Sequence, residues 1–253
     1  MLRTVAGIAA KYAGAQRIGV STAGEVDAAT GVIRYAANIP GYTGLPVKKL
    51  LQEMTQMPVA LENDVNAAAL GEMHFGAGKQ DALTNFLMVN YGTGIGGAIV
   101  LNGALHYGMS GSAGEIGGLI THPEAVTSEV GSGSYERYAS TAALVRHTTR
   151  LSPKLNSGRA VFAAIGHRPV QMLVQRWIDE VAAGLVGAIH LLNPQAVVLG
   201  GGILSEEMVF SGIQKRVLPM LKPTFATTQI VRARLGGQAS MYGAGLLASK
   251  IQL

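Results

Sequence analysis

The glycine run Gly92–Gly97 constrains this chain most, because both of its flanks are apolar and rich in strand-forming residues. The run formally satisfies G-x-G-x-x-G, the dinucleotide fingerprint. That fingerprint needs a helix directly after the glycines, so that the pyrophosphate sits on the helix N-terminus. Here Ala98–Leu101 and the turn signal Asn102-Gly103 follow instead, and they predict a tight type I′ hairpin. The pattern therefore argues against a nicotinamide-dependent oxidoreductase.

Two glycine clusters are candidate nucleotide ligands. A glycine turn between strands can present backbone N–H groups to a phosphate, and the turn Gly92-Thr93-Gly94 adds a hydroxyl; an ordinary hairpin turn is the alternative. The triplet Gly200-Gly201-Gly202 follows an apolar strand and precedes a helix that Ser205 is predicted to cap. Open α/β sheets place ligands at such a position, where bare backbone can lie against an adenine or ribose. A tight strand-to-helix connection is the alternative here.

The rest of the chain alternates between strand and helix patterns, which predicts an α/β fold in two halves joined near residue 85. A long amphipathic helix begins at Pro169 and stops at Asn193-Pro194. The remaining predicted elements are strands at 17–26, 58–62 and 229–235, a helix at 46–56, an alanine-rich helix from Asp64, and a closing helix at 240–250.

Composition limits the partners and the compartment. Only 14% of the 253 residues are charged, against about 25% in an average domain, which leaves surface for subunit contact and favours a homodimer. The net charge of +5 is not gathered into a basic run, so no nucleic-acid partner is expected. The absence of cysteine favours a reducing compartment, the cytoplasm, and no segment is long enough to indicate a membrane span.

Three acidic residues carry the candidate chemistry. Asp64 lies where a strand passes into a helix, so it is either a plain N-cap or a general base beside the amide of Asn63. Glu115 and Glu136 lie in glycine-rich segments and suit vicinal sugar hydroxyls; the alternative is a pair of surface acids, with Glu136 paired to a neighbouring arginine, Arg137 or Arg146. The six histidines show no metal-ligand spacing.

Taken in order, IGVSTAGEVD, ANIPGY, LENDVNAAALGE, YGTGIGGAIVLNGAL, GSAGEIG, YERYAST and VVLGGGI resemble the ROK family of sugar kinases and repressors. The resemblance implies an actin-like, hexokinase-like (ribonuclease H-like) two-domain ATPase fold. It implies Asp64 as catalytic base, a sugar site made by Asn38, Asn63, Glu115 and Glu136, and an ATP site made by the two glycine clusters.

The chain departs from the family pattern at three points. Gly118 and the residues after it replace the His and cysteines of a zinc loop, so no zinc is expected, and STAALV resembles a zinc-free branch with β-glucoside kinases, glucokinases and N-acetylmannosamine kinase-like proteins. The family's first Asp-x-Gly-Gly-Thr hairpin does not occur, so the first strands of the N-terminal domain are expected to be missing. Nothing resembling a winged helix precedes the kinase region.

We therefore expect an N-terminal lobe at 1–85, with the closing helix 240–253 packed on it, and a C-terminal lobe at 86–239. The resemblance implies that ATP and Mg²⁺ bind between the lobes and that Asp64 accepts the proton of a hexose hydroxyl. The 6-hydroxyl is the expected acceptor of the phosphoryl group. The sugar itself, whether glucose, an N-acylhexosamine or a β-glucoside, is left open. The alternative function is a non-catalytic sugar sensor.

Overall fold

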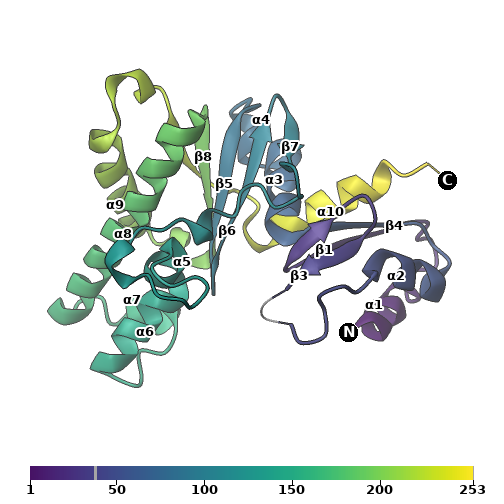
Figure 1. Cartoon of the computed structure of the whole chain (residues 1–253), viewed down its shortest axis with the longest axis horizontal. Helices are drawn as coiled ribbons and strands as arrows, with labels where there is room; N and C mark the ends of the chain where they lie inside the picture. The colour runs from purple at the N-terminus through teal and green to yellow at the C-terminus, as the bar shows by residue number, and fades with distance from the viewer. Residues whose placement is uncertain (37–38, 253) are drawn as a thin grey trace. The chain divides into compact units, whose positions relative to one another are not determined.

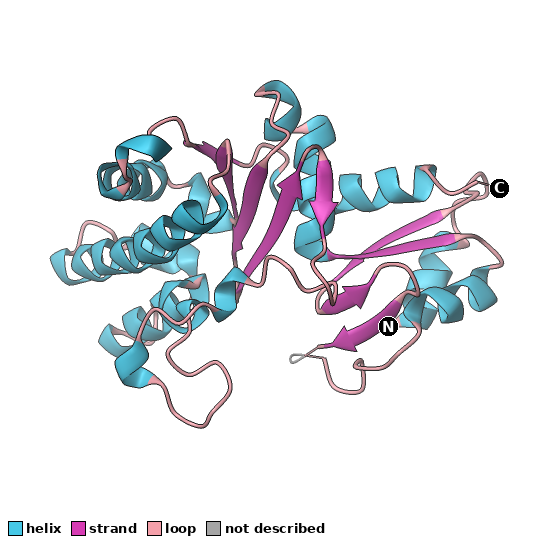
Figure 2. Ribbon diagram, turned by 45° about the horizontal axis from the view of Figure 1, so that its top comes forward, coloured by secondary structure: helices cyan, strands magenta, loops and turns pink. Residues whose placement is uncertain are grey.

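The computed structural model describes residues 1–36 and 39–252, and the chain forms two compact units. Unit 1 comprises Met1–Thr84, Ala98–Ala113 and Gly237–Leu253, and unit 2 comprises Asn85–Gly97 and Gly114–Gly236. The segment Ala98–Ala113 thus joins unit 1, although the division drawn from the sequence put it in the C-terminal lobe. Each unit is a mixed α/β structure, as the alternating patterns predicted (Figure 2). No helix among the described residues is long and apolar enough to cross a membrane.

Unit 1 is built on two short sheets. Strands β1 and β4 pair in parallel, and β2 and β3 form an antiparallel hairpin (Figure 1). Its elements are α1 (Leu2–Ala9), β1 (Ile18–Thr22), β2 (Glu25–Asp27), β3 (Val32–Tyr35), α2 (Val47–Thr55), β4 (Val59–Asn63), α3 (Asp64–Phe75), α4 (Ala77–Gln80), β7 (Ala104–His106) and α10 (Ala239–Ser249). A core of buried apolar side chains joins the sheets to α2: Val26, Ile33, Tyr42, Val47, Leu51, Val59 and Leu61.

Strand β6 (Ile95–Leu101) begins in unit 2 and ends in unit 1, where it pairs antiparallel with β7. The two residues between these strands, Asn102 and Gly103, have φ values of 52° and 73°. Positive φ at both central positions is the requirement of a type I′ turn, so the predicted hairpin is confirmed. The glycine run is therefore followed by a strand and not by a helix.

Helix α10 packs on α3 and β1 at very short range, because glycines remove the side chains between them. A Cβ atom at Gly243 would overlap the backbone of Ala67 in α3, and one at Gly71 would overlap the carbonyl oxygen of Ala239. Gly19 of β1 meets the backbone of α10 in the same way. The closing helix is thus held against the helix that begins at Asp64.

Unit 2 contains a parallel sheet in which β8 pairs with β5 on one side and β9 on the other. All five residues of β8 are buried, which fits a parallel strand covered on both faces. Apart from the start of β6, the unit's other elements are helices and turns. The bounds are β5 (Phe86–Tyr91), η1 (Ile116–Gly118), η2 (Pro123–Ala125), α5 (Tyr135–Ala139), α6 (Thr141–Leu151), α7 (Gly158–Ala163), α8 (Arg168–Leu192), β8 (Ala196–Gly200), η3 (Gly202–Ser205), α9 (Glu207–Val217), η4 (Leu218–Met220), η5 (Pro223–Phe225), β9 (Gln229–Arg232) and η6 (Gly236–Gln238). The last two residues of η6, Gly237 and Gln238, belong to unit 1.

The long helix α8 confirms the amphipathic pattern read from the sequence. It buries one face and ends where Asn193 takes a left-handed conformation, with φ of 45°. The predicted cap of the next helix was wrong. The hydroxyl of Ser205 donates to the carbonyl oxygen of Gly202, within the turn η3, and α9 begins only at Glu207. A 3₁₀ turn that begins at the last glycine of the triplet, Gly202, therefore uses the hydroxyl that was predicted to cap the helix.

The α3–α10 contact yields a stability prediction. We expect Gly243→Ala to lower the free energy of unfolding by about 1–3 kcal/mol, because the added methyl group overlaps the Ala67 backbone. Gly245→Ala, two residues along the same helix with open space around it, is the matched control. It should instead raise stability by about 0.5–1 kcal/mol. Urea unfolding of both variants measures the difference, and equal midpoints would contradict the proposed close contact.

Candidate active site

The junction between β4 and α3 orients the carboxylate of Asp64. Its Oδ1 atom accepts from the backbone N–H of Val65 at 3.0 Å and from the Asn63 side-chain amide at 3.1 Å. Both donors lie on one oxygen, so the carboxylate is held in a fixed orientation while its other oxygen, Oδ2, is available for a further partner. An oriented carboxylate of this kind is the geometry that a general base requires.

Asn63, and not Asp64, is the N-cap of α3. The Asn63 side-chain oxygen accepts from the backbone N–H groups of Val65, at 2.8 Å, and Asn66, at 3.1 Å. Its amide nitrogen donates to Asp64 and, at 3.0 Å, to the carbonyl oxygen of Gly24. Both halves of the amide are therefore occupied within the chain. The plain-cap alternative for Asp64 is not what the structure shows, since Asp64 is the first helical residue.

Burial raises the pKa of the Asp64 carboxyl above its usual value, and hydrogen bonds from the backbone N–H groups of Val65 and of Asp64 itself and from the Asn63 side chain oppose that rise. A raised pKa makes the carboxylate a stronger proton acceptor once it is ionised. Because the pKa is raised, the ionised form is lost at a higher pH than for an exposed aspartate as the solution is acidified. The site thus combines a fixed orientation with increased basicity.

A buried acid supports this junction from behind. Glu62 is only 1% exposed, and its carboxylate accepts three hydrogen bonds. Oε1 accepts from the Asn63 backbone at 2.9 Å and the Asn66 amide at 3.0 Å, and Oε2 accepts from the Tyr107 hydroxyl at 2.7 Å. Buried charge is tolerated when it is hydrogen-bonded in this way. Tyr107 thereby fastens the segment after β7 to the residue that precedes Asn63.

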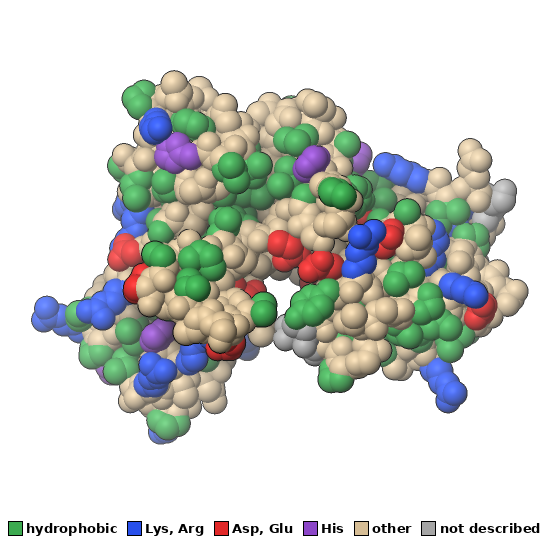
Figure 3. Space-filling view, in the orientation of Figure 1, with side chains coloured by type: hydrophobic (Ala, Val, Ile, Leu, Met, Phe, Trp, Pro, Cys, Tyr) green, Lys and Arg blue, Asp and Glu red, His purple; other side chains and the backbone are tan. Residues whose placement is uncertain are grey.

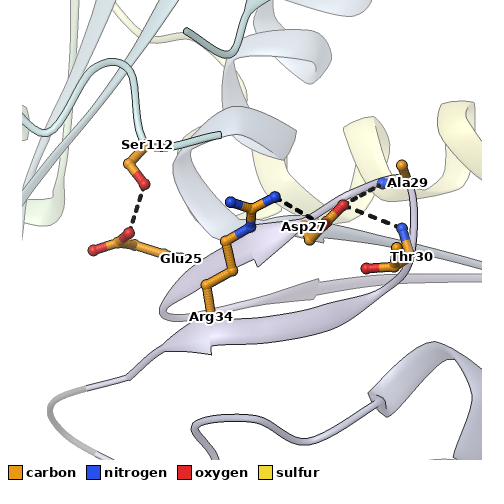
Figure 4. Close-up of polar contacts among 6 residues, drawn as sticks. All are labelled: Glu25, Asp27, Ala29, Thr30, Arg34 and Ser112. Carbon is orange, nitrogen blue, oxygen red and sulfur yellow. Dashed lines mark hydrogen bonds and ion pairs between the residues drawn. The ribbon is translucent and has the colours of Figure 1, made fainter. Parts of the chain in front are cut away.

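The β2–β3 hairpin follows Gly24 directly, and its polar contacts are shown in Figure 4. The Asp27 carboxylate accepts from the backbone of Ala29 at 3.1 Å and Thr30 at 3.2 Å, and from Arg34 at 2.8 Å. The first strand of the hairpin is tied to the segment after β7, because the Ser112 hydroxyl donates to Glu25 at 2.5 Å. These contacts hold the hairpin that begins one residue after Gly24, whose carbonyl oxygen accepts from Asn63.

Unit 2 brings both glycine clusters into one pocket of about 740 Å³. Strands β5 and β8 end side by side, with Asn90 opposite Gly200, so the two clusters begin at the same edge of the sheet. Gly201 has φ of 113°, and a Cβ atom there would overlap the backbone of Tyr91. The pocket lining is Tyr91, Gly92, Thr93, Thr141, Gly158, Arg159, Phe162, Ala163, Gly202, Ile203, Ser205 and Glu206. Its volume suits a cofactor-sized ligand.

The two candidate sugar carboxylates both lie near the start of β6. Glu136 accepts a hydrogen bond at 2.8 Å from the backbone N–H of Ile95, directly after the phosphate turn. Glu115 precedes the turn η1, whose Gly117 packs against the carbonyl oxygen of Ile95. The arginine partners considered for Glu136 are engaged elsewhere, since Arg137 pairs with Glu129 and Arg146 donates to the backbone of Arg137.

The segment between the two acids is held by a histidine. The ring of His122 stacks on Tyr138 with a centroid distance of 3.6 Å, and its Nε2 lies 3.5 Å from a carboxylate oxygen of Glu180 in α8. Among the described residues, no group of three or more His, Asp or Glu side chains is placed to hold a metal ion. The expectation that zinc is not bound stays a prediction.

Each unit therefore assembles part of the predicted site. Unit 1 contains Asn63 and Asp64, whereas unit 2 contains Glu115, Glu136 and the glycine clusters. Asn38 lies outside the described residues. Sequence reasoning gave no role to Glu62, Tyr107 or Arg159. Glu62 could have been suspected because it lies in an apolar strand beside Asn63, but no local pattern marks the other two.

Comparison with known proteins gives the class. A model of the ROK family matches residues 1–251. A glucokinase of Thermotoga maritima is 31% identical over 246 residues, covering 90% of this chain and 77% of the glucokinase. A ROK family glucokinase of Streptomyces griseus, solved with glucose and AMPPNP, superposes with a TM-score of 0.86 at 29% identity, covering 99% of this chain and 88% of the other. A xylose repressor of Bacillus spizizenii is 29% identical, covering 79% of this chain and 52% of the repressor.

The fold is thus the actin-like, hexokinase-like fold of ROK sugar kinases, as the resemblance implied. The chain belongs to the ROK family.

The cap geometry yields a prediction for the junction. Replacing Asn63 with Ala removes the acceptor for two N–H groups of α3, and we expect the free energy of unfolding to fall by about 1 kcal/mol. Asn63→Ser keeps a side-chain oxygen suited to an N-cap and should recover most of that loss. Denaturant unfolding of the three proteins is the measurement. If Asn63→Ala and Asn63→Ser were equally unstable, the capping role of the side chain would be wrong.

Proposed function

We propose that this chain transfers the γ-phosphoryl group of ATP to a hexose-type sugar at the 6-hydroxyl, with Asp64 as the general base. At the level of class it is an ATP-dependent carbohydrate kinase. The observation that carries the finer proposal is the Asp64 carboxylate, whose Oδ1 atom is engaged by two donors and whose pKa is raised. We assign Oδ2 to the proton of the sugar hydroxyl.

The nucleotide part of the proposal rests on the pocket of unit 2. The turn Gly92–Gly94 is assigned to the phosphates through the N–H groups of Thr93 and Gly94 and the hydroxyl of Thr93, because the Gly92 N–H already donates to the Gly94 carbonyl oxygen at 2.9 Å. The triplet Gly200–Gly202 is assigned to the adenosine, since Gly202 lines the same pocket as Thr93. Mg²⁺ would bind together with the ATP phosphates and neutralise their charge during transfer. We assign no side chain of this chain to the Mg²⁺ ion.

The sugar part of the proposal assigns Asn63, Glu115 and Glu136 to the hydroxyls of the sugar. Glucose, an N-acylhexosamine and a β-glucoside are the substrates to test, the last because β-glucoside kinases are among the similar proteins. Asn63 must then exchange one internal hydrogen bond for a sugar hydroxyl, because its amide is fully used within the chain. Asn38, by the resemblance, belongs to the same sugar site.

We further propose that the kinase works as a homodimer in the cytoplasm. Large hydrophobic side chains are exposed on both units, which supports subunit contact (Figure 3). On unit 1, for example, Phe75 at the end of α3 contacts Tyr242 of α10 with a ring distance of 5.6 Å while both remain exposed.

The second candidate function is a sugar sensor that binds sugar without using ATP. The similarity of this chain to a xylose repressor supports the sensor function. Calorimetry with the sugar and with ATP, each alone, distinguishes the two functions, since a sensor need bind only the sugar. Phosphorus NMR of a reaction with Mg·ATP and glucose then identifies the product. A new phosphomonoester signal coupled to the C6 protons supports the kinase, and ATP that remains unchanged with every candidate sugar contradicts it.

The role of Asp64 yields a kinetic prediction. We expect Asp64→Asn to lower kcat by about 10²-fold or more, because an amide cannot accept the hydroxyl proton, while sugar affinity changes little. Asp179→Asn removes an exposed aspartate of α8 that pairs with Arg216 and should leave kcat within about twofold. Steady-state rates and sugar titrations measure both effects. Near-normal turnover of Asp64→Asn would remove Asp64 from the role of base.

A further inference from the structure

Helix α5 and the first residue of α6 bind the phosphate turn at three points. Glu136 accepts from the Ile95 N–H at 2.8 Å, at the C-terminal side of the turn. Thr141 binds the N-terminal side, since its N–H donates to the Gly92 carbonyl oxygen at 3.1 Å and its hydroxyl donates to the Tyr91 carbonyl oxygen at 3.3 Å. The turn is thus held from both ends by residues only five positions apart.

The contact with Glu136 is close enough to explain a glycine. A Cβ atom at Gly94 would overlap the Oε2 atom of Glu136, the atom that receives the Ile95 hydrogen bond. Gly94 is therefore needed not only to bring backbone near a phosphate but also to admit the carboxylate. Any side chain at this position must displace Glu136 or move the turn.

The helix that carries Glu136 is itself rigidly placed. The hydroxyl of Tyr135 donates to the Val181 carbonyl oxygen in α8 at 2.7 Å and lies 2.7 Å from the Tyr91 hydroxyl in β5. Gly184 in α8 leaves the space that the Tyr135 ring occupies. Because Tyr135 is fully buried, the backbone beside it cannot shift freely, and a displacement of the Glu136 carboxylate must be taken up by its side chain or by the turn.

We propose that Glu136 couples sugar binding to the phosphate turn: one carboxylate oxygen fixes the Ile95 N–H while the exposed side chain remains accessible to the sugar. A sugar that orders this carboxylate also orders the turn, and a nucleotide that orders the turn presents the carboxylate to the sugar. This inference rests on the proposed function, because it takes Glu136 as a sugar ligand and the turn as a phosphate ligand. Such coupling is reciprocal, so each ligand raises the affinity for the other by the same factor.

The sharpest test changes the turn and measures the sugar. Gly94→Ala places a methyl group against the Glu136 carboxylate, and we expect glucose, titrated by calorimetry without nucleotide, to bind about tenfold more weakly. Gly187→Ala, an exposed glycine of α8 with open space around it, is the control and should bind glucose as the unchanged chain does. Gly94 itself is assigned to the phosphates and not to the sugar, so a change in glucose affinity without nucleotide would act through Glu136.

The reverse test changes the acid and measures the nucleotide. Glu136→Ala removes the acceptor for the Ile95 N–H, and we expect ADP, titrated without sugar, to bind several-fold more weakly. Glu136→Gln keeps an acceptor oxygen and should lie closer to the unchanged chain. Glu129→Gln, which removes an exposed acid on the same unit, is the control. A thermal unfolding curve shows whether Gly94→Ala folds. If it does not fold, the ADP titration of Glu136→Ala still tests the coupling.

The outcomes separate the two proposals. Unchanged glucose affinity in folded Gly94→Ala, or unchanged ADP affinity in Glu136→Ala, overturns the coupling and leaves the kinase proposal standing. If the unchanged chain binds neither ADP nor any of the three candidate sugars, the proposed function is overturned, and the coupling falls with it. Weakening in both arms, with both controls unaffected, supports the inference.

Discussion

The hydrogen bonds of the Asn63 side chain are the constraint on which the candidate site depends. One amide caps α3, binds the turn at Gly24 and orients the Asp64 carboxylate. Each of these elements is also held from elsewhere. The close glycine contacts between α3 and α10 hold the helix, and the buried Glu62 carboxylate holds the backbone before it. The position of one carboxylate is thus determined by several independent parts of unit 1.

In unit 2 the candidate ligand site is formed chiefly by glycine backbone, and neighbouring side chains hold that backbone in position. Parallel strands that end in glycines leave a pocket at one sheet edge, and the side chains that bind the glycine turn come from α5 and the start of α6. Glycine serves two purposes here. Gly201 lets the triplet lie against β5, and Gly94 admits an acid that we assign to the sugar. The glycines at these two positions therefore have a structural reason.

The sequence predicted features that depend on local conformation. The Asn102-Gly103 turn, the end of α8 at Asn193 and the strand before Gly200 are confirmed, because each is determined by φ preferences or by an unbroken apolar run. Family resemblance gave the fold. Contacts between distant residues could not be predicted, since nothing in the local pattern pairs Glu136 with Ile95 or Glu62 with Tyr107. The cap at Ser205 was wrong because a 3₁₀ turn intervenes.

The central claim is that unit 1 holds Asp64 as an oriented base of increased basicity, and a titration of that one carboxyl group tests it directly. Carbon NMR of the side-chain carboxyl carbon, assigned by its loss in a variant without the aspartate, gives the pKa of Asp64 without any ligand. The account predicts a pKa above the ordinary value of about 3.9, because burial outweighs the hydrogen bonds from Val65 and Asn63. A pKa at or below that value would contradict it.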